Sequence, residues 1–194
     1  MNSPDHVSEV HVFEATDSEL LSALREGGDE GRQAWSALVA RHSGRMYAVA
    51  RSFSLDTQTA EDLVQTAWLR LLERADQVRD PSAVGAWLCT IVRNEARRFL
   101  TRRREIPVMI GLSADTTDAA DEGLLREDRA RALRLAFAHL NRECQQLLRL
   151  LLVEPPLSYD EIAAALDRPR GSLGPTRRRC LDHLRQCLPA GFER

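Results

Sequence analysis

Two runs of arginine are the residues of this sequence best suited to a chemical task, and that task is binding a polyanion. Residues 93–104 carry six arginines against one acid, and residues 168–185 carry six against one. Guanidinium groups pair with phosphate and, when bidentate, with guanine edges. Such local cationic faces are the usual footprint of nucleic-acid binding, even in a chain whose net charge is −2. A solvated helix face is the alternative interpretation of either run alone.

The second arginine run falls in a pattern typical of a helix-turn-helix. Ser158 and Glu161 have the spacing of a capping box, and "DRPRG" supplies the turn. We expect Ser172 to cap the second helix, so that Pro175 takes its third position, where a backbone N–H has no helical partner. The N-terminal end of such a helix meets base edges in the major groove, whereas an ordinary helical hairpin with an arginine-rich surface would not. The predicted DNA contacts there are Arg170, Ser172, Pro175, Thr176, Arg178 and Arg179.

The first arginine run lies on a predicted helix over residues 81–104. Val84, Leu88, Val92 and similar residues define its inward side by their helical spacing. On the other side, Asn94 can read a base and the arginines can hold a backbone. The predicted contacts are Arg93, Asn94, Arg97, Arg98, Arg102, Arg103 and Arg104.

A third helix, expected over residues 57–75, presents a different surface. Apolar residues at helical spacing predict one buried side, and the opposite side combines acids and amides with an exposed Leu69. One exposed leucine alone means little. With its neighbours it forms a candidate docking site for a cationic partner. The predicted docking residues are Asp62, Gln65, Thr66 and Leu69.

These patterns predict an all-α chain with two small helical domains. Four helices are expected within residues 17–104, which we expect to form one compact unit. Residues 105–123 mix Pro, Gly, Ser, Thr and Asp without periodicity, so we expect a flexible acidic linker there. Residues 124–194 predict a second unit that ends in the helix-turn-helix, with Asn141 capping one of its helices. Residues 1–16 form an unassigned acidic segment.

The cysteines and histidines indicate no catalytic site. None of the four cysteines lies in a C-x-x-C pair, so their spacing indicates neither a zinc ribbon nor a redox motif. Cys180, His183 and Cys187 share one helical flank, where a metal site is a minor alternative to cysteines acting as small buried hydrophobes. No Gly-rich phosphate loop, His-x-x-x-His pair or nucleophile elbow is present. We therefore predict no enzyme activity, no cofactor and no metal.

Hydropathy and the first residues indicate the compartment. No apolar run approaches the roughly 18 residues that a membrane-spanning helix needs. The acidic start lacks the basic region of a signal peptide. We therefore predict no membrane insertion and a cytoplasmic protein.

The order of three segments resembles that of a bacterial sigma-70-family RNA polymerase sigma factor of the extracytoplasmic-function group: "TAEDLVQTAWLRLLE", "VGAWLCTIVRNEARRFLTRRR" and the terminal helix-turn-helix. The resemblance implies a sigma factor that directs promoter-specific initiation and assists DNA melting. Residues 17–104 would then bind core polymerase and the melted −10 element, and residues 124–194 the duplex −35 element.

The resemblance also implies partners for particular residues. Asp62, Gln65 and Leu69 match the segment that docks on the β′ clamp helices, while Thr66 stands where an acid is usual. Asn94 and the arginines after it match the segment that captures the −10 strand. The implied partners are RNA polymerase core, through its β′ clamp helices and β flap, and promoter DNA. An anti-sigma factor is a further candidate partner.

A second interpretation is an autonomous helix-turn-helix regulator that binds operators as a dimer. The two interpretations differ at residues 57–75, because a simple repressor has no need of a partner face there. A docking face on that helix therefore favours the sigma factor.

Overall fold

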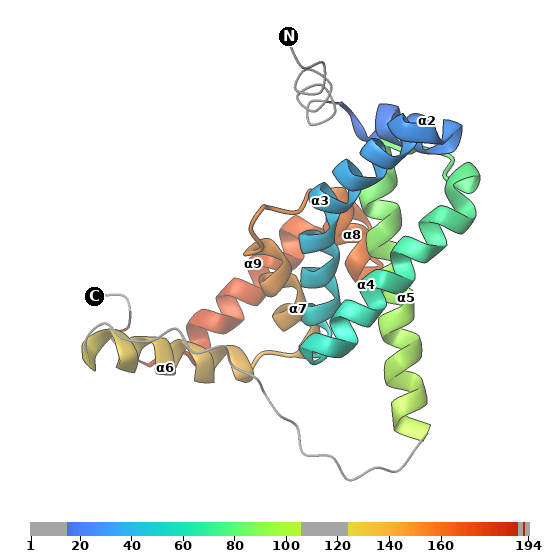
Figure 1. Ribbon diagram of the computed structural model, residues 1–194. Helices are drawn as coiled ribbons and strands as arrows, with labels where there is room; N and C mark the ends of the chain where they lie inside the picture. Colours follow the sequence, from blue (N-terminus) through green and yellow to red (C-terminus); the bar gives the residue numbers. More distant parts are fainter. Residues whose placement is uncertain (1–14, 106–123, 190–191, 193–194) are drawn as a thin grey trace.

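The computed structural model describes residues 15–105, 124–189 and 192, and within these ranges the chain forms helices and turns with no strand (Figure 1). The all-α prediction is confirmed. The predicted linker lies outside the described residues, apart from the end of the helix before it. The helices are α2 (Asp17–Glu26), α3 (Gly28–Ser52), α4 (Thr57–Arg74), η1 (Ala75–Gln77), η2 (Pro81–Ala83), α5 (Val84–Glu105), α6 (Leu124–Ala138), α7 (Arg142–Leu151), α8 (Tyr159–Leu166) and α9 (Arg170–Cys187).

Side-chain caps explain where four of the helices begin. Thr16 and Ser158 each form a capping box with the glutamate three residues later. Asp56 and Asn141 each accept a hydrogen bond from the backbone N–H three residues on. The caps predicted at Asn141 and Ser158 are therefore confirmed.

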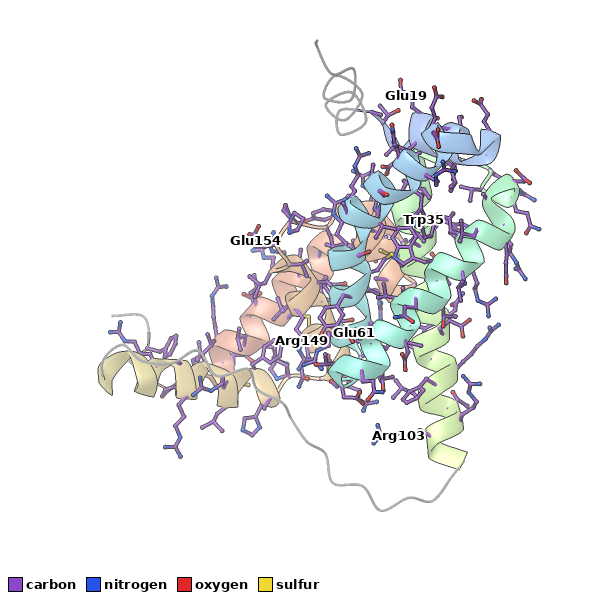
Figure 2. The ribbon with its side chains drawn as sticks, in the orientation of Figure 1. Glu19, Trp35, Glu61, Arg103, Arg149 and Glu154 are labelled. Atoms are coloured by element: carbon purple, nitrogen blue, oxygen red, sulfur yellow. A yellow bond between two sulfur atoms is a disulfide. The ribbon has the colours of Figure 1, made fainter. Side chains whose placement is uncertain are left out.

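The N-terminal unit, residues 17–105, packs α3, α4 and α5 around a common apolar core, with α2 lying against α3. Leu38, Leu71 and Leu88 are fully buried in that core. Trp35 and Trp68 pack edge to face with ring centroids 5.2 Å apart, and Figure 2 labels Trp35. The helical spacing that predicted the inward sides of α4 and α5 is confirmed.

The C-terminal unit, residues 124–188, holds α7, α8 and α9 together, while α6 contacts α9 near its C-terminal end (Figure 1). Leu147, Ile162 and Leu173 are its main buried side chains. A disulfide joins Cys144 of α7 to Cys180 of α9, with a Cα–Cα distance of 5.3 Å. The sequence interpretation missed this pair, because only the fold brings two cysteines 36 residues apart into contact.

The two units pack directly against each other. α5 contacts α8, α3 contacts α7, and buried residues of both units belong to one continuous apolar cluster. Leu38 and Leu88 of the first unit share that cluster with Ile162 and Ala165 of the second. The sequence predicts two units, but nothing in it predicts this shared core.

Two helices begin elsewhere than predicted. α5 begins at Val84, because residues 81–83 form the short 3-10 helix η2. α9 begins at Arg170, with Pro169 before it and no side-chain cap. Ser172 does not cap the helix, because its hydroxyl donates to the carbonyl of Pro169 at 2.7 Å.

The earlier start of α9 places Pro175 inside the helix rather than in its third position. A proline there cannot donate to the carbonyl four residues earlier, which belongs to Gly171. A Cβ at Gly171 or Gly174 would meet no other heavy atom within 4 Å, so the backbone around the proline is open. The proline is thus accommodated in an exposed, glycine-flanked turn of the helix.

None of the helices in the described ranges is both long and apolar enough to cross a bilayer.

Candidate nucleic-acid interface and docking face

The α5 arginines divide into a covered group and an open group. Arg93 is the most covered, with 11% of its side chain exposed, and Arg97 is half exposed. Arg98 pairs with Glu95 at 2.9 Å but stays largely open. Arg102 and Arg103 are exposed, and Figure 2 shows Arg103 near the end of α5. The side chain of Arg104 lies outside the described residues.

Asn94 and Arg93 form one polar group. The Asn94 side-chain oxygen accepts hydrogen bonds from Nε and Nη2 of Arg93, at 3.2 and 2.9 Å. Asn94 is half-buried rather than fully exposed. The candidate base reader is therefore held by its neighbouring guanidinium.

A stripe along α5 faces α8, and its first member is a glycine. Gly85, Cys89, Arg93 and Arg97 recur every four residues and so lie on one side of the helix. A Cβ at Gly85 would lie 2.8 Å from Oε1 of Glu161, closer than side chains approach. Glycine therefore permits the close contact between α5 and α8.

Asp167 binds the two arginines at the C-terminal end of this stripe. Its carboxylate accepts hydrogen bonds from Arg93 at 3.0 Å and from Arg97 at 3.1 Å. Arg93 also donates to the carbonyl of Ala164 at 2.8 Å, in the last turn of α8, where carbonyls lack helical partners. The hydrogen bond from Arg97, together with the charge of Arg93, holds the pKa of Asp167 below its usual value.

Glu161 lies against Gly85, at the N-terminal end of the stripe. Its side chain is 5% exposed, accepts the Ser158 N–H at 2.7 Å and pairs with Arg45 at 3.4 Å. Burial, with a smaller contribution from the Glu161 carboxylate, raises the pKa of the Cys89 thiol well above its usual value. A charge pair with a buried carboxylate and a partly exposed guanidinium thus crosses the contact between the units.

The cationic surface of α9 lies elsewhere and is open. Pro175, Arg178 and Arg179 are exposed, as predicted, and Ser172 is half-buried. Arg170 is exposed and pairs with Asp160 at 3.0 Å.

Thr176 does not lie on the open side of α9. The expectation that it is exposed is wrong, because Leu173, Thr176 and Cys180 form the buried side, and Thr176 is only 8% exposed. Its hydroxyl accepts a hydrogen bond from Arg179 at 3.3 Å. In this arrangement Thr176 can orient Arg179, but it has little surface to offer a ligand.

The candidate docking face of α4 consists of Asp62, Gln65, Thr66 and Leu69, and the structure places these residues on one open side of the helix. Leu69 is 60% exposed, and Leu72 beside it, which the sequence interpretation missed, is also exposed. Thr66 is half-buried, and its hydroxyl donates to the carbonyl of Asp62 at 2.8 Å. An apolar centre with acidic and amide neighbours fits a partner surface that is apolar and cationic.

Asp167 and Glu161 are the residues of the interface between the units that sequence reasoning missed. In the sequence, Asp167 reads as an ordinary acid of a turn, and Glu161 as an ordinary acid of a capping box. The sequence held one indication of these contacts. The helix α5 carries more arginines than acids, so acids from elsewhere in the chain can pair with them. Cys180, considered above for a metal site, is bonded to Cys144 instead.

Comparison with known proteins bears on the same regions. Residues 38–106 match the Sigma-70 region 2 family. The matched residues include α4, α5 and most of α3. SigE of Mycolicibacterium smegmatis, an ECF RNA polymerase sigma factor, is 29% identical over 183 residues, covering 86% of this chain and 70% of that protein. RfaY of Xanthomonas campestris pv. campestris, named a probable RNA polymerase sigma factor, is 28% identical over 126 residues, covering 61% of this chain but only 32% of its own length.

Two solved structures share the fold. CnrH, in complex with the cytosolic domain of CnrY, gives a TM-score of 0.57 at 22% identity over 88% of this chain and 95% of that chain. The sigma factor RpoE of Bartonella quintana, in complex with the anti-sigma factor NepR, gives 0.57 at 23% identity over 78% of this chain and 94% of that chain.

The described helices therefore carry an open apolar and acidic face on α4 and cationic surfaces on α5 and α9. Residues 38–106 thus belong to the Sigma-70 region 2 family, and over most of its length the chain is similar to extracytoplasmic-function RNA polymerase sigma factors. Its function is therefore in transcription initiation, and it is not an enzyme.

Proposed function

We propose that this sigma factor binds core RNA polymerase through the α4 docking face and directs initiation at promoters with a −10 and a −35 element. The observation that carries the proposal is the separation of surfaces. The apolar and acidic docking face is on α4, whereas the cationic surfaces are on α5 and α9. One chain can therefore hold a protein partner and DNA at the same time.

The α5 surface is suited to single-stranded DNA. Asn94 offers an amide, and the arginines around it offer several phosphate contacts along one helix. A strand of melted DNA exposes base edges that a single amide can read, and its backbone can follow the arginines. We assign the melted −10 strand to this surface, with Arg93, Asn94, Arg97, Arg98, Arg102, Arg103 and Arg104 as the candidate contacts.

The α9 surface is suited to duplex DNA. Arg178 and Arg179 project from the middle of α9, a helix that follows a short turn after α8, and this arrangement can place a recognition helix in the major groove. We assign the −35 element to this surface, with Arg170 and Ser172 in the first turn of the helix and Pro175 in the next. Thr176 acts there by orienting Arg179.

The remaining partners follow from the same assignment. The docking face would meet the β′ clamp helices and the C-terminal unit the β flap, with the acidic linker between them. Since a related fold is solved with the anti-sigma factor NepR, and another with the cytosolic domain of CnrY, an anti-sigma factor is a further candidate partner for this chain. A cytoplasmic location accords with a polymerase subunit.

DNA binding with and without core polymerase tests the proposal. The free protein should bind promoter duplex weakly in a gel shift, because its own acids occupy several of the arginines. Addition of purified core should produce sequence-specific complexes. Tight, dimeric operator binding by the free chain would overturn the proposal in favour of an autonomous regulator.

A further inference from the structure

The contact between α5 and α8 covers part of the surface that we assign to the −10 strand. Arg93 is almost fully covered, and Asn94 is half-buried beside it. Arg178 and Arg179 of α9, by contrast, remain exposed in the same structure. The packing of the two units therefore covers part of one proposed DNA surface, at Arg93 and Asn94, and leaves the other open.

The group that binds the covered α5 arginines is the carboxylate of Asp167, at the position where we expect a phosphate of the DNA to bind. Asp167 binds Arg93 and Arg97 together, at 3.0 and 3.1 Å, and these two guanidiniums lie one helical turn apart. A backbone phosphate offers the same negative oxygens to the same donors. Asp167 and a nucleic-acid strand would thus compete for one site.

The backbone conformation at the end of α8 places Asp167 where it can bind these arginines. It ends α8 with φ of 60° and ψ of 47°, a left-handed conformation that aspartate and asparagine tolerate better than most residues. Arg93 also donates to the Ala164 carbonyl and so caps the C-terminal end of α8. The end of α8 and the turn of the helix-turn-helix are therefore fixed on α5 by one arginine.

We infer that Asp167 is a latch that holds the C-terminal unit on α5 and keeps Arg93 and Arg97 from single-stranded DNA until the units separate. This inference rests on the proposed function only for the identity of the competing ligand. The latch adds to the contact made by the shared apolar core and by the Arg45–Glu161 pair. Because Asp167 is itself half exposed, its removal should loosen that contact rather than abolish it.

Cys89 provides a direct reporter of separation. It lies on the α5 stripe that faces α8, between Gly85 and Arg93, and is 1% exposed. Its thiol should react with N-ethylmaleimide only when the units part. Cys144 and Cys180 are joined in a disulfide, and peptide mapping by mass spectrometry separates Cys89 from the more exposed Cys187.

The test compares the full-length protein with Asp167→Asn, which keeps a residue suited to the left-handed conformation and removes the charge. Asp160→Asn is the matched control, because Asp160 is an exposed acid of the same helix that pairs only within its own unit. We expect Asp167→Asn to speed Cys89 alkylation by roughly 3- to 10-fold, as the loss of two partly exposed ion pairs implies. Asp160→Asn should match the unaltered protein, and far-UV circular dichroism should be the same for all three.

Binding of a fluorescent single-stranded oligonucleotide of mixed sequence separates the latch from the proposed function. Asp167→Asn should tighten this binding by a similar factor, as measured by anisotropy. Faster alkylation without tighter binding would uphold the latch and remove α5 from the proposed DNA interface. Equal Cys89 alkylation rates in all three proteins would overturn the latch. Arg97→Gln gives a second check, since it removes the other side of the same ion pair and should also speed alkylation.

Discussion

At the scale of single residues, the chemistry of this protein depends on which guanidiniums are already engaged. Arg93 has three acceptors within the chain, on Asn94, Ala164 and Asp167. Arg178 is exposed, and among the described residues the hydrogen-bond partner of Arg179 is the Thr176 hydroxyl, a weak competitor for a phosphate or a guanine. The same residue type therefore has different availability on the two cationic helices.

Asn94→Ala should impair transcription even from a promoter with an optimal −35 element, because the displaced −10 base would lose its amide partner. The expected loss is about 10-fold, the lower part of the range for a lost base contact. A premelted bubble template should reduce the loss, since the strand no longer has to be captured during melting. Thr101→Ala, at an exposed position of the same helix, is the control. Equal loss on duplex and bubble templates would contradict a role in strand capture.

Arg179→Ala should weaken recruitment to the −35 duplex by about 1–3 kcal/mol if its guanidinium is bidentate to a guanine. Binding of the core complex to −35 variants, measured across salt concentrations, checks this. A loss that is uniform across sequences, with a flatter salt dependence, would indicate a phosphate contact instead. Arg185→Ala is the control, because Arg185 pairs with Asp182 further along α9. No change in either property would remove Arg179 from the interface.

At the scale of secondary-structure elements, α4 has one side that packs in the core and an opposite side that is open for the proposed docking. One side is core, with Ala60, Ala67 and Leu71 fully buried, and the other side is the docking face. A substitution on the open side should therefore leave the fold intact. This independence makes the docking face a clean target for mutation.

The double substitution of Leu69→Arg and Asp62→Arg should abolish association with core polymerase. Two added cations would oppose a cationic partner and remove the apolar centre, so we expect a loss of at least about 10-fold in affinity. Gln33→Arg, at an exposed position of α3, is the control for added charge. Far-UV circular dichroism should not change. Unchanged pull-down of core by the double variant would show that α4 is not the docking element.

The disulfide between α7 and α9 should stabilise the C-terminal unit. It closes a loop of 36 residues, and the loop-closure model gives about 4 kcal/mol for a loop of that size. Dithiothreitol should therefore shift urea unfolding of that unit to lower concentration. A variant with Cys144→Ala and Cys180→Ala should unfold at the same urea concentration with and without reductant. Insensitivity of the unaltered protein to reductant would show that the bond contributes nothing.

The sequence predicts most elements because their signals are local. Helical spacing places the core sides of α4 and α5, and the box at Ser158 places the start of α8. The start of α9 was misjudged, because the Ser172 hydroxyl bonds backward to Pro169 rather than forward into the helix. Thr176 was misjudged with it, since an error in the helix start changes which residues are assumed to be open.

Contacts between distant segments could not be predicted in the same way. The Cys144–Cys180 bond and the Arg93–Asp167 pair join residues 36 and 74 positions apart. Neither pair has a local signature, because each residue type has an ordinary role in its own helix or turn. The packing of α5 on α8 depends on Gly85, whose importance appears only when Glu161 lies against it.

At the scale of the whole molecule, the packing of the two units covers part of the proposed −10 surface. The two units share one apolar cluster, and charged pairs cross between them at Arg45–Glu161 and at Asp167. If the protein binds core polymerase through α4, as proposed, that binding would leave this contact untouched, and the units could separate after docking. A closed free form and an open bound form would limit stray binding to nucleic acid and couple DNA capture to the polymerase.

In vitro transcription with purified core polymerase on a genomic promoter library tests the central claim most directly. With this protein added, core should initiate at a defined set of promoters that share −10 and −35 sequences at fixed spacing. Without it, the same promoters should give no specific transcripts. Specific initiation that is the same with and without the protein would contradict its role as a promoter-specificity subunit.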